Sequence, residues 1–131
     1  MFAFTAAAVQ WKAAAASFAC PRGARYKARM ASHKLDDEEV AKRLTQLAGW
    51  TLQAGKLHRE YRFGDFVEAF GFMAGAALVA ERMNHHPEWF NVWSTVRIDL
   101  TTHDAGGISA KDFELAAAME RIAGALKPVT K

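Results

Sequence analysis

Three of the five histidines lie between positions 85 and 103, in a segment that also carries carboxylates. His85 and His86 are adjacent and precede Pro87, and His103 follows a short alternation of apolar and polar residues. Imidazole is the side chain whose ordinary pKa allows it both to give and to take a proton near neutral pH. Because three such groups lie close together in the chain, the segment predicts an acid–base catalytic site.

Two other interpretations of the histidine segment compete with catalysis. Surface histidines often have no chemical role, and three histidines with Glu88 or Asp104 could instead bind zinc. The segment has no His-x-x-x-His spacing and no neighbouring cysteine, so it does not favour a metal centre. We therefore expect no metal here.

Trp89 and Asp112 each fit two roles. Trp89 is either a core aromatic side chain or a stacking platform for a flat ligand. Asp112 is the third residue after Ser109, so a helix capping box explains it. It also follows His103 closely in the sequence, which leaves a role at the site open.

The elements that must position the histidines follow from capping residues and hydrophobic periodicity. Capping residues ahead of apolar stripes predict helices over 36–49, 65–83 and 109–126. Alternating residues predict hairpins over 50–63 and 90–102. The order α-β-β-α-β-β-α predicts an α+β fold, a four-stranded antiparallel sheet with helices packed on one face.

The pairing expected in the second hairpin brings the histidines together. A turn at Ser94-Thr95 places residues 86–88 opposite residues 101–103. His103 would then end its strand beside the adjacent histidine pair, at one edge of the sheet.

The middle predicted helix is apolar on more than one side. One side of it is lined by an apolar stripe of Phe66, Phe70, Met73, Ala77 and Ala80. Phe72, Leu78 and Val79 lie on other sides. Such a helix needs more cover than one sheet face supplies, so we expect a homodimer or homotetramer, the alternative being burial inside the monomer.

The charge of the chain is divided unevenly. The net charge is +3, but residues 1–30 carry five basic and no acidic groups, which leaves 12 basic and 14 acidic groups in residues 31–131. The body is therefore mildly acidic, and we expect no direct nucleic-acid partner. No apolar run reaches the roughly 18 residues that span a bilayer, so no membrane partner is expected either.

Residues 1–30 have the composition of a leader. They are rich in alanine and contain basic but no acidic residues, which is typical of an organellar transit peptide. An extension without function and a true start at Met30 are the alternatives.

The lone Cys20 cannot form an internal disulfide, so the sequence does not imply an oxidising compartment. We expect a single domain at 31–131, in the cytoplasm, or in a mitochondrion or plastid if the leader acts in targeting.

The spacing of the site residues resembles the pterin-4a-carbinolamine dehydratases, also called 4a-hydroxytetrahydrobiopterin dehydratases. The residues that carry the resemblance are Glu81, His85-His86-Pro87, Trp93, His103 and Asp112, together with the Trp50 hairpin and the segment from Phe63 to Met73. The resemblance runs from about His33 to Leu126 and leaves the leader outside.

The resemblance implies an enzyme that dehydrates 4a-hydroxytetrahydrobiopterin to quinonoid dihydrobiopterin during tetrahydrobiopterin regeneration, without metal or cofactor. It also implies a dimer or tetramer assembled through helices. The catalytic residues would be His85, His86 and His103, with the proton transfers at His85 and His103 and a pterin-positioning role at His86. The pterin would further contact Asn84, Pro87, Trp89, Thr101, Thr102 and Asp104. Glu81 and Asp112 would orient the histidines.

One position departs from the family pattern, and two other functions remain open. Asn84 stands where many members have an acidic residue, and an amide cannot tune a neighbouring imidazole as a carboxylate does. The chain could instead serve as a non-catalytic assembly factor that uses its helical surface, as some members do for a homeodomain transcription factor. It could also act on another oxidised pterin.

Overall fold

The computed structural model of the chain describes residues 32–126. The leader expected at 1–30 lies outside the described residues, as do residues 127–131. In chain order the elements are α1 (Asp37–Leu44), β1 (Thr51–Gln53), β2 (Lys56–Arg62), α2 (Phe66–Met83), β3 (Glu88–Val92), β4 (Thr95–Leu100), the 3₁₀ helix η1 (His103–Ala105) and α3 (Ala110–Ala125). The predicted α+β order is therefore confirmed, with η1 added between β4 and α3.

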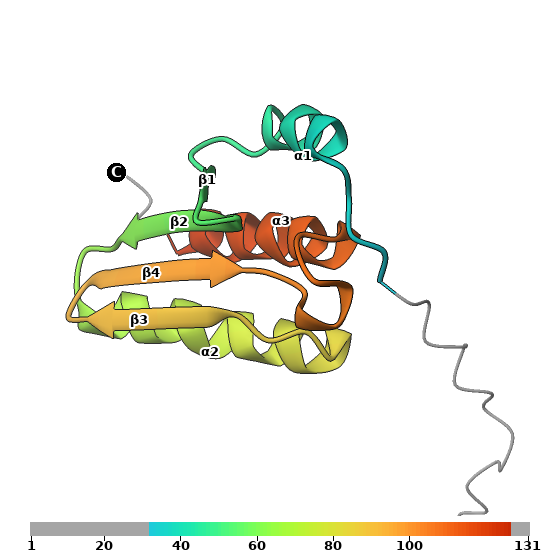
Figure 1. Ribbon diagram of the computed structural model, residues 1–131. Helices are drawn as coiled ribbons and strands as arrows, with labels where there is room; N and C mark the ends of the chain where they lie inside the picture. Colours follow the sequence, from blue (N-terminus) through green and yellow to red (C-terminus); the bar gives the residue numbers. More distant parts are fainter. Residues whose placement is uncertain (1–31, 127–131) are drawn as a thin grey trace, which may run out of the picture. The chain divides into compact units, whose positions relative to one another are not determined.

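The four strands form one antiparallel sheet in the order β1-β2-β4-β3. Figure 1 shows α2 and α3 side by side behind this sheet, covering the same face. The inward side chains of β4 are Val96, Ile98 and Leu100, and all three are fully buried, as the alternation predicts. Leu57 of β2 completes the buried row, so the core lies between the central strands and the two long helices.

The first helix is shorter than predicted. It ends at Leu44 instead of continuing to Gly49, because the next amides bond three residues back and tighten the chain into turns. Gly49 then takes a positive φ of 82°, and an added Cβ there would overlap the Arg59 guanidinium. A residue other than glycine would be strained here by the positive φ, and the Arg59 side chain would have to move.

The second hairpin turns one residue earlier than predicted. Val92 pairs with Thr95, so Trp93 and Ser94 form the two-residue loop, and the Asn91 amide donates to the carbonyl oxygens of Trp93 and Thr95. Glu88 consequently pairs with Asp99. The expectation that residues 86–88 oppose residues 101–103 is therefore wrong by two positions.

The inward face of α2 also differs from the apolar stripe noted in the sequence. Its buried residues are Ala69, Phe72, Ala76 and Ala80. The helix is rotated because the Phe72 ring packs against Tyr61 and Phe63, with ring centroids 4.8 and 5.1 Å away.

Among residues 32–126, no helix has both the length and the apolar character needed to cross a bilayer.

Candidate active site

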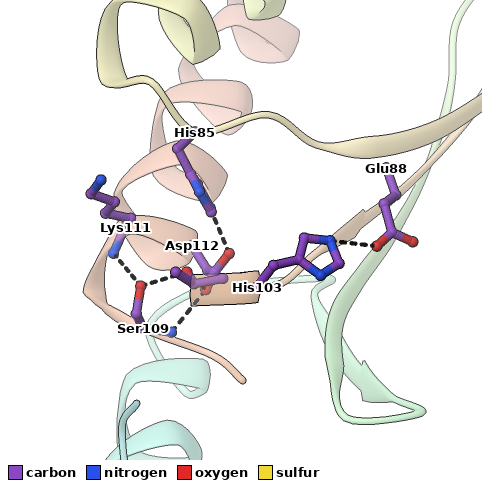
Figure 2. A network of polar contacts seen from close by, with 7 residues as sticks. His85, Glu88, His103, Ser109, Lys111 and Asp112 are labelled. Atoms are coloured by element: carbon purple, nitrogen blue, oxygen red, sulfur yellow. Dashed lines mark hydrogen bonds and ion pairs between the residues drawn. The ribbon is translucent and has the colours of Figure 1, made fainter. Parts of the chain in front are cut away.

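A fully buried carboxylate lies at the centre of the polar network in Figure 2. Asp112, in the first turn of α3, uses its two oxygens differently. Its Oδ1 lies 2.7 Å from Nε2 of His85, and its Oδ2 accepts from the Ser109 amide and the Thr102 hydroxyl, each at 2.8 Å. Three donors therefore satisfy a charge that would otherwise be costly to bury.

Thr102 and Ser109 form the other side of this network. The Thr102 hydroxyl donates its proton to Asp112, so Ser109 Oγ is the donor in the 2.6 Å contact between the two hydroxyls. Ser109 Oγ also accepts from the Lys111 amide, and the predicted capping box is present. Asp112 thus contacts the cap through one oxygen and His85 through the other, and its role at the site stays a prediction.

The end of α2 sets the direction of His85. Asn84 is the C-cap residue, in the left-handed conformation (φ 46°, ψ 49°) that asparagine tolerates better than most residues. The His85 amide then bonds back to the Ala80 carbonyl. This closes the helix end and directs the imidazole toward Asp112, and His85 is only 7% exposed.

The second histidine of the pair faces a different carboxylate. His86 Nε2 lies 2.9 Å from Oε2 of Glu81, one turn back on α2, and both side chains are largely exposed. Adjacent extended residues point in opposite directions, and the network accordingly separates a buried His85 from an exposed His86.

His103 was predicted to end a strand, but it lies in η1. Its imidazole is 80% exposed and Nε2 lies 3.4 Å from Oε1 of Glu88, the first residue of β3. Figure 2 shows it turned away from the His85–Asp112 pair. Each of the three histidines therefore faces its own carboxylate.

The remaining predicted contact residues lie around these pairs. Trp89 is half-buried on β3 and packs against the core. Thr101 lines a cavity of about 390 Å³ together with His103 and Lys56. Pro87 is half-buried ahead of β3, and Asp104 is exposed within η1.

Sequence reasoning missed two residues of this network. Ser109 was recognised only as a helix cap, although its hydroxyl also bonds to Thr102. Glu88 was not predicted to contact a histidine, whereas it lies between Lys56 and His103. Glu88 and His103 lie in different elements, so no local pattern signals their contact.

The arrangement provides two kinds of imidazole–carboxylate pair, one buried and one exposed. In the buried pair, Asp112 holds Nε2 of His85, and no hydrogen bond to Nδ1 of His85 is found within residues 32–126. Such a group can take up or release a proton at its second nitrogen. No three His, Cys, Asp or Glu side chains in that range converge as metal ligands would.

The sequence of the chain matches a known family and several of its relatives. The family described as pterin 4 alpha carbinolamine dehydratase matches residues 33–122. A protein of Solibacter usitatus, provisionally named a pterin-4-alpha-carbinolamine dehydratase, is 61% identical over 90 residues, covering 69% of this chain and 95% of the relative. A similarly named protein of Rhizobium johnstonii is 51% identical over 96 residues, 72% of this chain and 95% of its own.

A solved structure shares the fold. The crystal structure of a transcriptional coactivator/pterin dehydratase from Brucella melitensis superposes with a TM-score of 0.68 at 42% identity. It covers 70% of this chain and all of the Brucella chain.

Proposed function

The chain belongs to the pterin-4-alpha-carbinolamine dehydratase family, and on this premise we propose that it dehydrates a 4a-hydroxytetrahydropterin. The substrate would be 4a-hydroxytetrahydrobiopterin or a close analogue, and the products quinonoid dihydropterin and water. The observation that carries the proposal is the buried pair of His85 and Asp112, with Nε2 and Oδ1 2.7 Å apart.

The reaction requires two proton transfers. The C4a–O bond breaks as the departing hydroxyl receives a proton, and the N5 lone pair forms the C4a=N5 double bond. The proton on N5 then leaves to a base, so that one proton is delivered and one removed. A pair of imidazoles supplies both groups and is restored when they exchange protons with solvent.

We assign the removal of the N5 proton to His85. Asp112 is an acceptor at both oxygens, so His85 Nε2 carries its hydrogen toward Oδ1 and Nδ1 is the basic nitrogen. When Nδ1 takes a proton, the adjacent carboxylate stabilises the imidazolium. The buried network also fixes the ring orientation, which lowers the entropy cost of the transfer.

We assign delivery of the proton to His103. Its imidazole is exposed and faces a carboxylate, conditions that suit a group that must recharge from solvent after each turnover. His86, Trp89 and Thr101 would then hold the pterin ring, with further contacts from Asn84, Pro87 and Asp104. Thr102 would act through Asp112.

Absorbance-monitored dehydration of a synthetic 4a-hydroxytetrahydropterin tests this assignment. We expect His85→Ala and His103→Ala each to lower kcat by about 100-fold or more, the usual scale for removing a general acid or base. The matched control is His33→Ala, since His33 is exposed and makes no contact in the network. The proposal is wrong if the wild type does not exceed the uncatalysed rate, or if both variants retain wild-type kcat.

A non-catalytic assembly role is the second candidate. It is favoured by the exposed apolar side chains of α2, Val67 and Leu78 above all, which are 77% and 76% exposed. The related Brucella structure also carries the word coactivator in its name. An assembly factor would keep its partner binding in the His85→Ala variant, whereas the dehydratase activity would be lost.

A further inference from the structure

Glu88 occupies a position on the outer face of the sheet where its carboxylate has a like charge opposite. It is the first residue of β3, and the strand alternates so that Glu88 and Phe90 face outward. Its partner in the register is Asp99 of β4. Two carboxylates directly opposite on neighbouring strands repel each other, so each needs a stabilising partner elsewhere.

Their partners lie on separate sides. Asp99 Oδ1 is 2.8 Å from Nδ1 of His58 on β2. Glu88 Oε2 accepts from the Lys56 ammonium at 2.6 Å. With Asp99 directed toward His58 and one oxygen of Glu88 held by Lys56, the other oxygen of Glu88 is presented to His103, 3.4 Å away.

Within residues 32–126, few other contacts restrict the His103 side chain. It lies in a 3₁₀ helix of three residues whose N-cap makes no side-chain hydrogen bond, and its side chain is 80% exposed. An exposed side chain on a short turn samples several rotamers, and holding it in one costs conformational entropy. A carboxylate fixed on a strand can reduce that cost.

We propose that Glu88 is a positioning residue that holds the His103 imidazole in its working orientation, with Lys56 anchoring the Glu88 carboxylate. The inference rests on the proposed function, because it assigns His103 a proton transfer. It connects three segments that are distant in the chain, the start of β2, the start of β3 and η1. Glu88 itself does not exchange a proton with the substrate.

The kinetic test is a double-mutant cycle on the full-length protein. We expect Glu88→Ala to lower kcat by about 2- to 5-fold with KM within about twofold, the scale of one exposed ion pair. Glu88→Gln should lie between wild type and Glu88→Ala, since its amide oxygen still accepts from Lys56. Lys56→Met should also lower kcat, because it removes the ammonium that holds the Glu88 carboxylate. In a His103→Ala background, Glu88→Ala should have no further effect, because Glu88 acts only through His103.

The control for charge removal is Glu60→Ala, since Glu60 lies exposed on the same face and pairs with Arg62. Wild-type kcat is expected for this variant. A KM-only effect of Glu88→Ala, or an equal loss of kcat in the His103→Ala background, would overturn the proposal.

A spectroscopic measurement separates this inference from the proposed function. In ¹⁵N-detected spectra of the imidazoles, Glu88→Gln should move the ring signals of His103 and leave those of His85 unchanged, while the backbone spectrum shows an intact fold. If the wild type is inactive as a dehydratase, the proposed function fails, yet the ring signals still report the contact. Unmoved His103 signals in Glu88→Gln would refute the positioning role whatever the activity.

Discussion

At the scale of single residues, Asp112 connects the fold to the proposed chemistry. One of its oxygens caps the helix that carries it, and the other holds His85. Because the side chain is fully buried, its geometry is set by packing and not by solvent. The same carboxylate also holds Thr102 and Ser109 in place, because both donate hydrogen bonds to it.

Asp112→Asn tests that arrangement with almost no change of shape. An amide presents one oxygen and one donor, so the donor must face His85, Thr102 or the Ser109 amide. Either His85 switches to the wrong tautomer or a buried donor loses its partner, at about 1–3 kcal/mol of unfolding free energy. We expect kcat to fall by about 100-fold or more, measured in the dehydration assay beside denaturant unfolding.

Glu114→Gln is the matched control, an exposed carboxylate-to-amide change on the same helix. It should behave as wild type in both measurements. Wild-type kcat in Asp112→Asn would show that the carboxylate does not set the His85 tautomer.

At the scale of elements, a half-buried carboxylate joins the sheet to α3. Glu120 Oε1 accepts from Tyr61 Oη at 2.6 Å and from Trp50 Nε1 at 2.9 Å, and Arg59 lies within ion-pair distance. Burial raises the pKa of the Tyr61 phenol well above its ordinary value, and the bond to Glu120 raises it further. The fold therefore holds Tyr61 neutral.

The sign of the resulting pH dependence follows from the raised pKa. An unfolded tyrosine ionises near pH 10, whereas the folded one keeps its proton, so the stabilisation is complete below about pH 10 and falls above it. We expect the wild-type free energy of unfolding to fall more steeply between about pH 9.5 and 11 than that of Tyr61→Phe. Near pH 7, Tyr61→Phe should cost about 0.5–1.5 kcal/mol.

Denaturant titrations at a series of pH values check this difference. Parallel curves for wild type and Tyr61→Phe above pH 10 would contradict a neutral, buried Tyr61.

At the scale of the whole molecule, the outer side of α2 remains apolar. Exposed apolar side chains on this helix are Phe66, Val67, Phe70 and Leu78. Apolar side chains grouped on one exposed face are typical of an interaction surface. The expected homodimer or homotetramer thus stays a prediction, and this surface is where we expect the contact.

Light scattering on the full-length chain tests the assembly. We expect a mass that is two or four times the 14.5 kDa of the chain. Leu78→Glu should lower that mass at micromolar concentration, because a charge would be buried at the contact. Ala41→Glu, an exposed change on α1, is the control. A monomeric wild type, or an unchanged mass for Leu78→Glu, would contradict the prediction.

Local pattern was sufficient for much of the fold. The caps at Asp36, Asp65 and Ser109 begin helices as predicted, since their side chains accept from nearby amides. The inward alternation of β4 is likewise a property of neighbouring residues. These features depend on contacts within a few residues of each other.

Features that depend on distant partners were predicted less well. The sequence did not indicate which side of α2 is buried. That side is set by the packing of Phe72 against the rings of Tyr61 and Phe63, which lie outside the helix. The position of the turn at Trp93-Ser94 depends on which pairing of the strands buries the most apolar surface. A shift of one residue at the turn moves the strand register by two residues.

The same division applies to the histidine cluster. The sequence alone determined which residues are available for acid–base chemistry and, through their spacing, the family resemblance that the comparisons confirm. Only the tertiary structure decided that Asp112 faces His85 and that Glu88 faces His103. The physical reason is that Asp112 and Glu88 are brought to their histidines by packing and strand register, which no local pattern contains.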